Sequence, residues 1–263
     1  MKFLTLFFLF TTLLFSKIYY AKVEPYEIRN ISSEVSGVVV FVDKDMLGKQ
    51  LSAKPYIQID SVFDEYEIKY TKEKIVYIQN TIDSNEKVLK NLQELLKRKR
   101  VNYDKVKVLK IKSSVEKDRE FYDLVASENQ FLNTQKEINS LRTQLADLKL
   151  RAIALRRSIN DKNLKAKGFV FYSWSVEVGQ VVGMSTPLAK VADISRAKLV
   201  IYLDEVDLVN INEKKVYIDG LQTDYKISRV LNIADEKNIS KYMAHIIIKS
   251  PKIFSKLVQV ELK

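Results

Sequence analysis

The chain of 263 residues has no cysteine, one histidine, six glycines and four prolines. The absence of cysteine excludes disulfides, thiol nucleophiles, cysteine–zinc sites and lipidation at a cysteine. A single histidine excludes a metal site built from several histidines. That histidine, His245, lies in an apolar segment and is predicted to be structural, and neither a P-loop nor a glycine-rich dinucleotide motif is present. We therefore predict that the protein is not an enzyme and has no catalytic residue, metal site or cofactor.

The amino terminus has the features of a secretory signal peptide. A short positive start precedes an apolar run over residues 3–15, and a polar exit follows. Spanning a bilayer takes about 20 apolar residues, so this run is short for a permanent anchor. We assign residues 1–21 to a signal peptide, with a retained N-terminal anchor or a buried core helix as the alternatives. Cleavage after Ser16 or after Ala21 stays open, because neither position completes an Ala-x-Ala pattern.

Residues 56–167 contain neither glycine nor proline and are rich in lysine, glutamate, leucine and glutamine. Because turns recruit glycine and proline, this composition predicts long helices. Apolar residues also recur every seven positions, with partner positions three residues further on, which is the pattern of a coiled coil. The first series is Ile68, Ile75, Ile82, Leu89, Leu96 and Tyr103, and the second is Leu124, Phe131, Ile138, Leu145, Ala152 and Ile159.

The heptad pattern fails between about Ile111 and Lys117, where a polar segment is predicted to form a turn. We expect residues 61–163 to form an antiparallel helical hairpin, with Ser114 capping the second helix. Each arm would hold about 45 to 50 residues and extend about 70 Å at 1.5 Å per residue. A dimer of parallel helices with a break is the alternative. Three polar residues at seam positions are expected to cost stability and to help fix the register: Asn85, Lys99 and Thr134.

The segments that flank the hairpin show strand patterns instead. They are rich in β-branched and aromatic residues and are separated by turns, over residues 36–42, 56–60, 168–171, 176–183 and 187–191. Each flank holds about 30 residues, below the roughly 40 that a domain needs to fold without a disulfide or a metal. We therefore expect the two flanks to pair as halves of one β-domain, which would bring Val38 and Val181 into the same module.

Each flank has a Gly-Val-Val-like start, a turn glycine and a closing hydrophobic–aspartate pair, over residues 36–60 and 166–193. These halves resemble a biotinyl/lipoyl-like domain, and the order of parts resembles the membrane fusion protein family. The resemblance implies an α+β fold, in which a long antiparallel α-helical coiled-coil hairpin is inserted into a split biotinyl/lipoyl-like β-sandwich that a small β-barrel follows. The chain departs from the pattern at Lys167, where proline is usual. The hairpin occupies the place of a carrier's modified lysine, so we expect no covalent cofactor.

The carboxy-terminal part is predicted to form the barrel. Strand patterns cover residues 199–203, 216–218, 226–230, 244–248 and 258–262, with a short helical turn at 204–209. A closed barrel leaves no open edge, and residues 22–34 are expected to add a strand to it. The predicted organisation is a signal peptide or anchor at 1–21, an N-terminal strand and first lipoyl-like half at 22–60, the hairpin at 61–163, the second half at 164–194 and the barrel at 195–263.

The hairpin tip is the candidate docking site. Residues 85–119 carry 12 basic and five acidic residues, a net charge of +7 out of +11 for the chain. Such a surface favours an acidic partner, although a charged helix face also serves solubility alone. Adaptors of the family that dock outer-membrane channels carry Arg, Leu and Ser at the tip, where this chain has Lys105, Leu109 and Glu116. Lysine lacks the fork of arginine and glutamate reverses the polarity of serine, so docking in the usual mode is not supported. The predicted docking residues are Lys105, Val106, Leu109, Lys112 and Glu116.

The resemblance implies a non-enzymatic periplasmic adaptor, free or associated with the inner membrane. It would link an inner-membrane transporter to an outer-membrane channel for efflux or secretion across the Gram-negative envelope, and assemble into a ring, usually a hexamer in the family. We expect no nucleic-acid partner, because the basic run at residues 97–100 lies within a heptad series of a chain with a secretory signal. A structural coiled-coil scaffold of the envelope without a transport partner, or a soluble metal-binding chaperone of an efflux system, are the alternatives.

Overall fold

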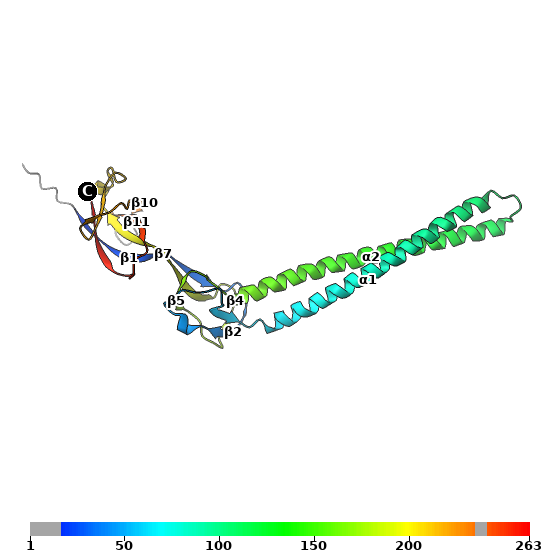
Figure 1. The fold of residues 1–263 in the computed structure, drawn as a ribbon, viewed down its shortest axis with the longest axis horizontal. Coiled ribbons are helices and arrows are strands. Elements are labelled where there is room, and N and C mark those ends of the chain that lie inside the picture. Colours follow the sequence, from blue (N-terminus) through cyan, green and yellow to red (C-terminus); the bar gives the residue numbers. More distant parts are fainter. Residues whose placement is uncertain (1–16, 235–240) are drawn as a thin grey trace, which may run out of the picture.

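The computed structural model describes residues 17–234 and 241–263, so the expected signal peptide lies outside the described residues except for its last five positions. The molecule is elongated and has three parts (Figure 1). A β-domain with the C-terminus lies at one end, a second β-domain lies in the middle, and a two-helix hairpin extends from it to the other end. Among the described residues, neither helix of the hairpin has the apolar stretch that a membrane span requires.

The hairpin consists of α1 (Val62–Lys107) and α2 (Ser114–Lys162), with 46 and 49 residues. The heptad positions are the ones that the partner helix shields: the fully buried residues are Thr71, Ile82 and Leu92 on α1 and Leu124, Ser127, Ile138, Leu145 and Leu155 on α2. Ion pairs across the seam fix the antiparallel register. Arg151 lies 2.6 Å from Glu67 and Arg142 lies 2.8 Å from Glu86. The two arms therefore pair within one chain, as the hairpin prediction requires.

A polar cluster closes the base of the hairpin. The Asp64 carboxylate at the start of α1 accepts a hydrogen bond of 2.6 Å from the Ser158 hydroxyl and lies 3.0 Å from the Lys162 ammonium group. Burial by itself raises the pKa of Asp64, but the Ser158 hydrogen bond and the Lys162 contact outweigh it and hold the pKa below its ordinary value. The first turn of one helix is thus fixed to the last turn of the other.

The middle domain joins the two flanks. Its four-stranded sheet has the order β4 (Asn163–Leu164), β3 (Ile57–Ile59), β2 (Gly37–Val42) and β6 (Val181–Val182). Val38 pairs directly with Val181, although more than a hundred residues separate them in the chain. A short 3-10 helix at Lys44–Met46 follows β2, and the loop after it bonds to β5 (Val170–Trp174) through Gly48 N–H and the Phe171 carbonyl at 2.8 Å. The split β-domain is therefore a single module.

The core of this module draws on both halves. Its buried residues are Val39, Val42, Leu51, Tyr56, Ile57 and Ile59 from the first half and Phe171, Val176, Val182, Leu188, Ala189 and Val191 from the second. Phe171 is completely buried, and its ring meets that of Tyr56 edge to face at 5.1 Å between centroids. A side-chain carbon added at Gly37 would lie 2.6 Å from Ile59 Cγ2, so only glycine lets these strands approach so closely.

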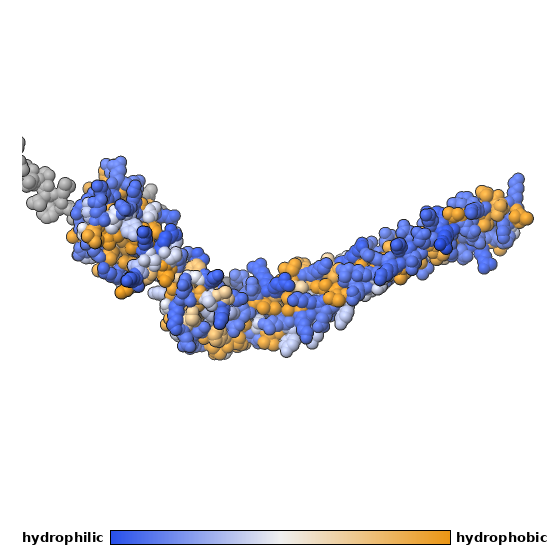
Figure 2. All heavy atoms as spheres, viewed as in Figure 1, coloured by the Kyte–Doolittle hydropathy of each residue, from blue (hydrophilic) through white to orange (hydrophobic). Residues whose placement is uncertain are grey.

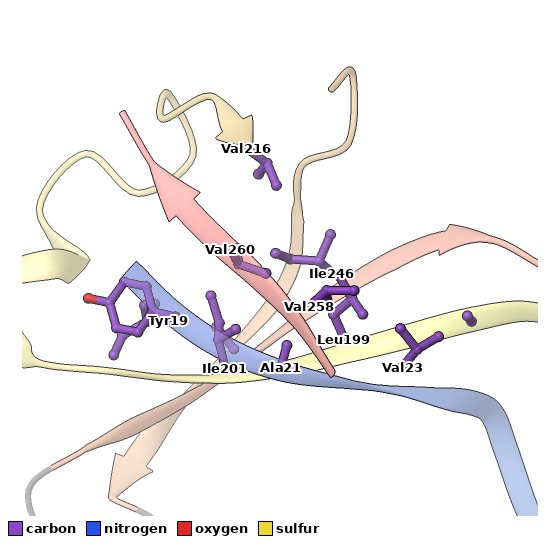
Figure 3. Close-up of a cluster of buried hydrophobic side chains, with 12 residues drawn as sticks. Tyr19, Ala21, Val23, Leu199, Ile201, Val216, Ile246, Val258 and Val260 are labelled. Carbon is purple, nitrogen blue, oxygen red and sulfur yellow. The ribbon is translucent and has the colours of Figure 1, made fainter. Parts of the chain in front are cut away.

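The end domain is a curled antiparallel sheet. The strand order is β10 (Ile227–Ala234), β11 (Tyr242–Lys249), β7 (Pro187–Leu203), β1 (Ile18–Ser32), β12 (Leu257–Leu262), β8 (Val216–Ile218) and β9 (Leu221–Gln222), and a 3-10 helix at Glu205–Leu208 follows β7. Figure 3 shows the side chains that fill its concave side, among them Ile201, Leu199 and Val260. The described strand pairs end at β10 and β9, so the sheet is a half-barrel instead of the closed barrel that we expected.

Two strands run through both β-domains. β7 is continuous across the boundary predicted at residues 194 and 195. β1 pairs with it from Val23 to Ser32 and begins at Ile18, inside the range 1–21 assigned to the signal peptide. The ladder is irregular between the domains, where Pro25 pairs with Ala197 and Glu27 pairs with Asp193. The β-domains are therefore joined by a two-stranded ribbon with a bulge.

Candidate docking site at the hairpin tip

The tip is a short loop held between two helix ends. α1 ends at Lys107, residues 108–113 form the turn, and α2 begins at Ser114. Aromatic rings pack beneath the loop, with Tyr103 and Phe121 5.7 Å apart between centroids and Phe121 in contact with Tyr122. Because Phe121 and Tyr122 stay 44% and 69% exposed, these rings cover the end of the seam only in part.

The second helix begins with a capping box. Ser113 is the N-cap: its hydroxyl accepts a hydrogen bond from the Glu116 backbone N–H at 3.3 Å, and the Glu116 carboxylate accepts one from the Ser113 backbone N–H at 3.0 Å. The expectation that Ser114 caps the helix is wrong by one residue. Ser114 is the first helical residue, and the position three residues beyond it is Lys117, which cannot complete the box.

Glu116 and Lys112 form an ion pair on this cap, 2.9 Å apart. The Lys112 ammonium group, together with the Ser113 backbone N–H and hydroxyl, lowers the pKa of Glu116 to about 2. The same contact raises the pKa of Lys112. Both predicted docking residues are therefore engaged in the structure of the turn, and Glu116 stays ionised at any physiological pH.

The other three predicted docking residues differ in their placement. Lys105 is exposed on the outer face of α1, and Leu109 is exposed in the turn. Val106 lies at a seam position and is half-buried, so it supports the turn and is not presented to a partner. Close by, Lys107 contacts Asp104 at 2.5 Å, and this pairing raises the pKa of Lys107. The structure thus brings the five residues together at one end of the rod but presents only some of them outward.

Three exposed aliphatic side chains of the tip were not among the predicted docking residues. Ile111 is 90% exposed, and Val108 and Val115 are also well exposed. Figure 2 shows hydrophobic side chains at the outer end of the rod, among hydrophilic ones. A sequence signal existed, because these apolar residues lie where the heptad pattern fails, so no seam can bury them. An apolar loop in a basic surround suits a partner with an apolar pocket and an acidic rim.

The histidine that the sequence analysis predicted to be structural lies outside the tip, in the half-barrel. His245 lies on β11 with its Nε2 3.3 Å from Met243 Sδ. Burial, and the charges of Lys198 and Arg229, lower the pKa of His245 and favour its neutral form. Among the described residues, no group of three or more His, Cys, Asp or Glu side chains is arranged to hold a metal ion.

Comparisons with known proteins show similarity in structure alone. No protein-family model matches the sequence, and no curated protein matches it. MacA from Actinobacillus actinomycetemcomitans is similar with a TM-score of 0.71 at 15% identity, over 94% of this chain and 78% of that one. The membrane fusion protein Spr0693 from Streptococcus pneumoniae is similar with a TM-score of 0.62 at 10% identity, over 94% of this chain and 99% of that one. A MacA–MexA chimera that contains the MexA α-hairpin domain of Pseudomonas aeruginosa is similar with a TM-score of 0.55 at 16% identity, over 94% of this chain and 81% of that one.

Similarities at such low identity establish the fold. The chain has the fold of membrane fusion proteins, as the resemblance in the sequence implied, with a helical hairpin inserted into a split β-sandwich and a half-barrel beside it. The fold by itself does not name partners, because function lies in the sites that a fold carries.

Proposed function

We propose that the protein is a periplasmic adaptor that links an inner-membrane transporter to an outer-membrane channel, for efflux or secretion across a Gram-negative envelope. Its role is mechanical and not enzymatic. The observation that carries this proposal is the rod: a two-helix hairpin that projects from a β-sandwich and ends in a basic loop with exposed aliphatic side chains (Figures 1 and 2). At 1.5 Å per residue, the 49 residues of α2 reach about 74 Å, enough to bridge part of the periplasm.

The two ends of the molecule would meet different partners. The half-barrel, which contains the amino-terminal strand β1, lies at the end of the molecule opposite the tip, so we assign the contact with the transporter to this end. The tip faces the channel: Leu109 and Ile111 supply apolar contact, and Lys105 supplies charge that steers an acidic partner. Copies of the chain form a ring around the conduit, for which a hexamer is our working number.

We also propose that the signal peptide is cleaved after Ser16. Cleavage after Ala21 would remove Tyr19 and Ala21, which are buried in the half-barrel core. It would also remove Lys17, which contacts Asp207 at 3.1 Å. Mass spectrometry of the exported protein tests this proposal, and a mature chain that starts at Lys22 would contradict it.

Site-specific cross-linking tests the adaptor function. Because the chain has no cysteine, a single introduced cysteine is the only thiol of this protein that the label can react with. Leu109→Cys, labelled with a photoactivatable maleimide in cells, is expected to capture an outer-membrane channel. Asn91→Cys serves as the matched control, because Asn91 is an exposed residue on the side of α1, away from the tip. If the exported and folded Leu109→Cys protein captures no channel, or no more than the control captures, tip docking is refuted and a coiled-coil scaffold becomes the better description.

A further inference from the structure

A cavity of about 350 Å³ lies on the outer face of the half-barrel sheet, on the side away from its apolar core. The side chains that line it come from four neighbouring strands, β1, β7, β11 and β10, and include Lys198, Arg229 and His245. Its volume is at the lower end of the range for small-molecule sites. The cavity therefore has room for a small charged group and part of the molecule that carries it.

The sheet register brings the basic side chains together. Lys198 lies between two core residues of β7, and His245 lies between two core residues of β11, so both side chains point away from the core. Arg229 pairs directly with His245, and Lys198 pairs with Ile247, two residues further along β11. Direct cross-strand neighbours lie about 4.5–5.5 Å apart and diagonal ones about 7–8 Å apart. The imidazole ring thus has a cation on each side.

The two cations have no acidic partner. Among the described residues, neither Lys198 nor Arg229 has a carboxylate within the 4.0 Å of an ion pair. Glu24 pairs with Lys198 in the β1–β7 ladder, but without such a contact. Glu27, which also lines the cavity, is already bound by Arg29 at 2.8 Å. Because uncompensated like charges on one face of a sheet repel each other, an anion that binds between them is favoured.

Other groups add donors and positive charge to the cavity. At the bulge of β10, Ser228 Oγ accepts the Ile247 backbone N–H at 3.2 Å, which leaves the hydroxyl hydrogen of Ser228 available as a donor. Arg196 lies over the ring of Tyr26, with Cζ 3.9 Å from the ring centroid, and adds a guanidinium beside the cavity. Donors that converge from several strands suit an anion with several oxygens around one centre, such as a phosphate group.

His245 is placed to respond to such an anion. Burial, and the charges of Lys198 and Arg229, lower the pKa of His245, whereas the charge of Glu24 acts in the opposite direction. An anion bound between the two cations would offset their charges, so the ring could take up a proton. The imidazolium would then offer hydrogen-bond donors at both ring nitrogens.

We propose that the cavity between Lys198, Arg229 and His245 binds a phosphate group, either as a soluble phosphate compound or as the headgroup of a lipid, and that His245 takes up a proton as the group binds. Since the protonated ring adds a charge and a donor, the affinity rises as the pH falls through the pKa of His245. The site lies at the end of the molecule opposite the tip, so this proposal goes beyond the adaptor function and does not depend on it.

An NMR titration of the full, untagged chain tests the site. His245 is the only histidine, so its imidazole gives a single set of ring signals. We expect inorganic phosphate to shift these signals saturably and to raise the pKa of His245, compared with chloride at equal ionic strength. The double variant Lys198→Gln, Arg229→Gln should bind phosphate at least about tenfold more weakly, because two charge-assisted hydrogen bonds are lost.

The matched control is the double variant Lys190→Gln, Arg156→Gln, which removes the same two charges at exposed positions outside the cavity and should bind like the unmodified chain. Sulfate serves for the pH dependence, because its charge stays constant between about pH 5 and 8, where histidine titrates. Its affinity should fall as the pH rises, and His245→Gln should make the pH profile flat. A flat profile for the unmodified chain would overturn the protonation of His245.

Vesicles that contain phosphatidic acid distinguish the two sources of phosphate. Vesicle binding that is lost in the Lys198→Gln, Arg229→Gln variant identifies a lipid headgroup, and binding of inorganic phosphate without the vesicles identifies a soluble compound. The site is refuted if neither phosphate nor the vesicles move the His245 signals. It is also refuted if this variant binds as well as the control while circular dichroism shows that both are folded. None of these outcomes bears on the capture of a channel through Leu109→Cys.

Discussion

Replacing Asn85 by leucine should stabilise the hairpin. Asn85 lies at a seam position between Ile82 and Leu89, and its side-chain Nδ2 is buried without a hydrogen-bond partner among the described residues. A buried polar group without a partner costs about 1–3 kcal/mol. Leucine is also a better helix former than asparagine by a few tenths of a kcal/mol. We therefore expect Asn85→Leu to raise the free energy of unfolding of the hairpin by about 2 kcal/mol.

Urea denaturation followed by helical circular dichroism measures this change. With a slope of roughly 2 kcal/mol per molar urea, the midpoint should rise by about 1 M at an unchanged slope. Asn91→Leu is the matched control, because it makes the same change at an exposed position of the same helix and should alter stability by less than about 0.5 kcal/mol. If Asn85→Leu is no more stable than this control, the amide has a partner or the seam cannot hold leucine, and our account of the seam is refuted.

Three further predictions concern the β-sandwich and the tip. Gly37→Ala should destabilise the sandwich by about 1–3 kcal/mol, since the new methyl group overlaps a buried isoleucine, and thermal unfolding measures the loss. Ser113→Ala should lower the stability of α2 by about 1 kcal/mol in urea denaturation. The carboxylate of Glu116 has a lowered pKa, so its contribution to the cap is complete above its ordinary pKa and disappears only as the pH falls toward about 2, which NMR titration of its side chain can follow.

Two of these predictions have a matched control variant. Gly183→Ala should be near neutral, because its new carbon meets nothing closer than 4.0 Å. Ser114→Ala should leave the cap intact. If Ser114→Ala lowers the stability of α2 more than Ser113→Ala does, the cap was assigned to the wrong serine. A titration midpoint for Glu116 near the ordinary glutamate value would mean that its contacts with Lys112 and Ser113 do not persist in solution.

The hairpin could be predicted from the sequence almost residue by residue. Its signal is local and repeated, since each turn of each helix places an apolar residue on the seam, and a long stretch without glycine or proline leaves no other element possible. The pairing of Val38 with Val181 could also be inferred, because neither flank has enough residues to bury a core alone. The predicted N-cap was one residue too late, because serine is a good N-cap at either position. The two serines differ in the residue three positions further on, which is Glu116 for Ser113 and Lys117 for Ser114, and only glutamate completes a capping box.

The boundaries of the β-domains were harder to predict. β7 passes from Val191 in the sandwich core to Ala197 in the half-barrel core through Asp193, Ser195 and Arg196, and because a polar stretch of this kind is also typical of a turn, the sequence does not reveal that the strand is continuous. The docking residues were chosen by resemblance and charge, which located the tip but not the direction of each side chain. Ile111 and Val115 were not among the predicted docking residues, although their place outside the heptad pattern indicated that no seam would bury them.

The ribbon formed by β1 and β7 determines how the molecule responds to force. The two strands run from the half-barrel into the sandwich (Figure 1) and pair with each other as an antiparallel ladder on both sides of the boundary. Tension applied at the far end of the rod would reach the half-barrel through the covalent backbones of both strands, which would carry the load together. Between the pairs Pro25–Ala197 and Glu27–Asp193, β7 has three residues where β1 has one, so we expect bending between the two β-domains to concentrate at this irregular part of the ladder.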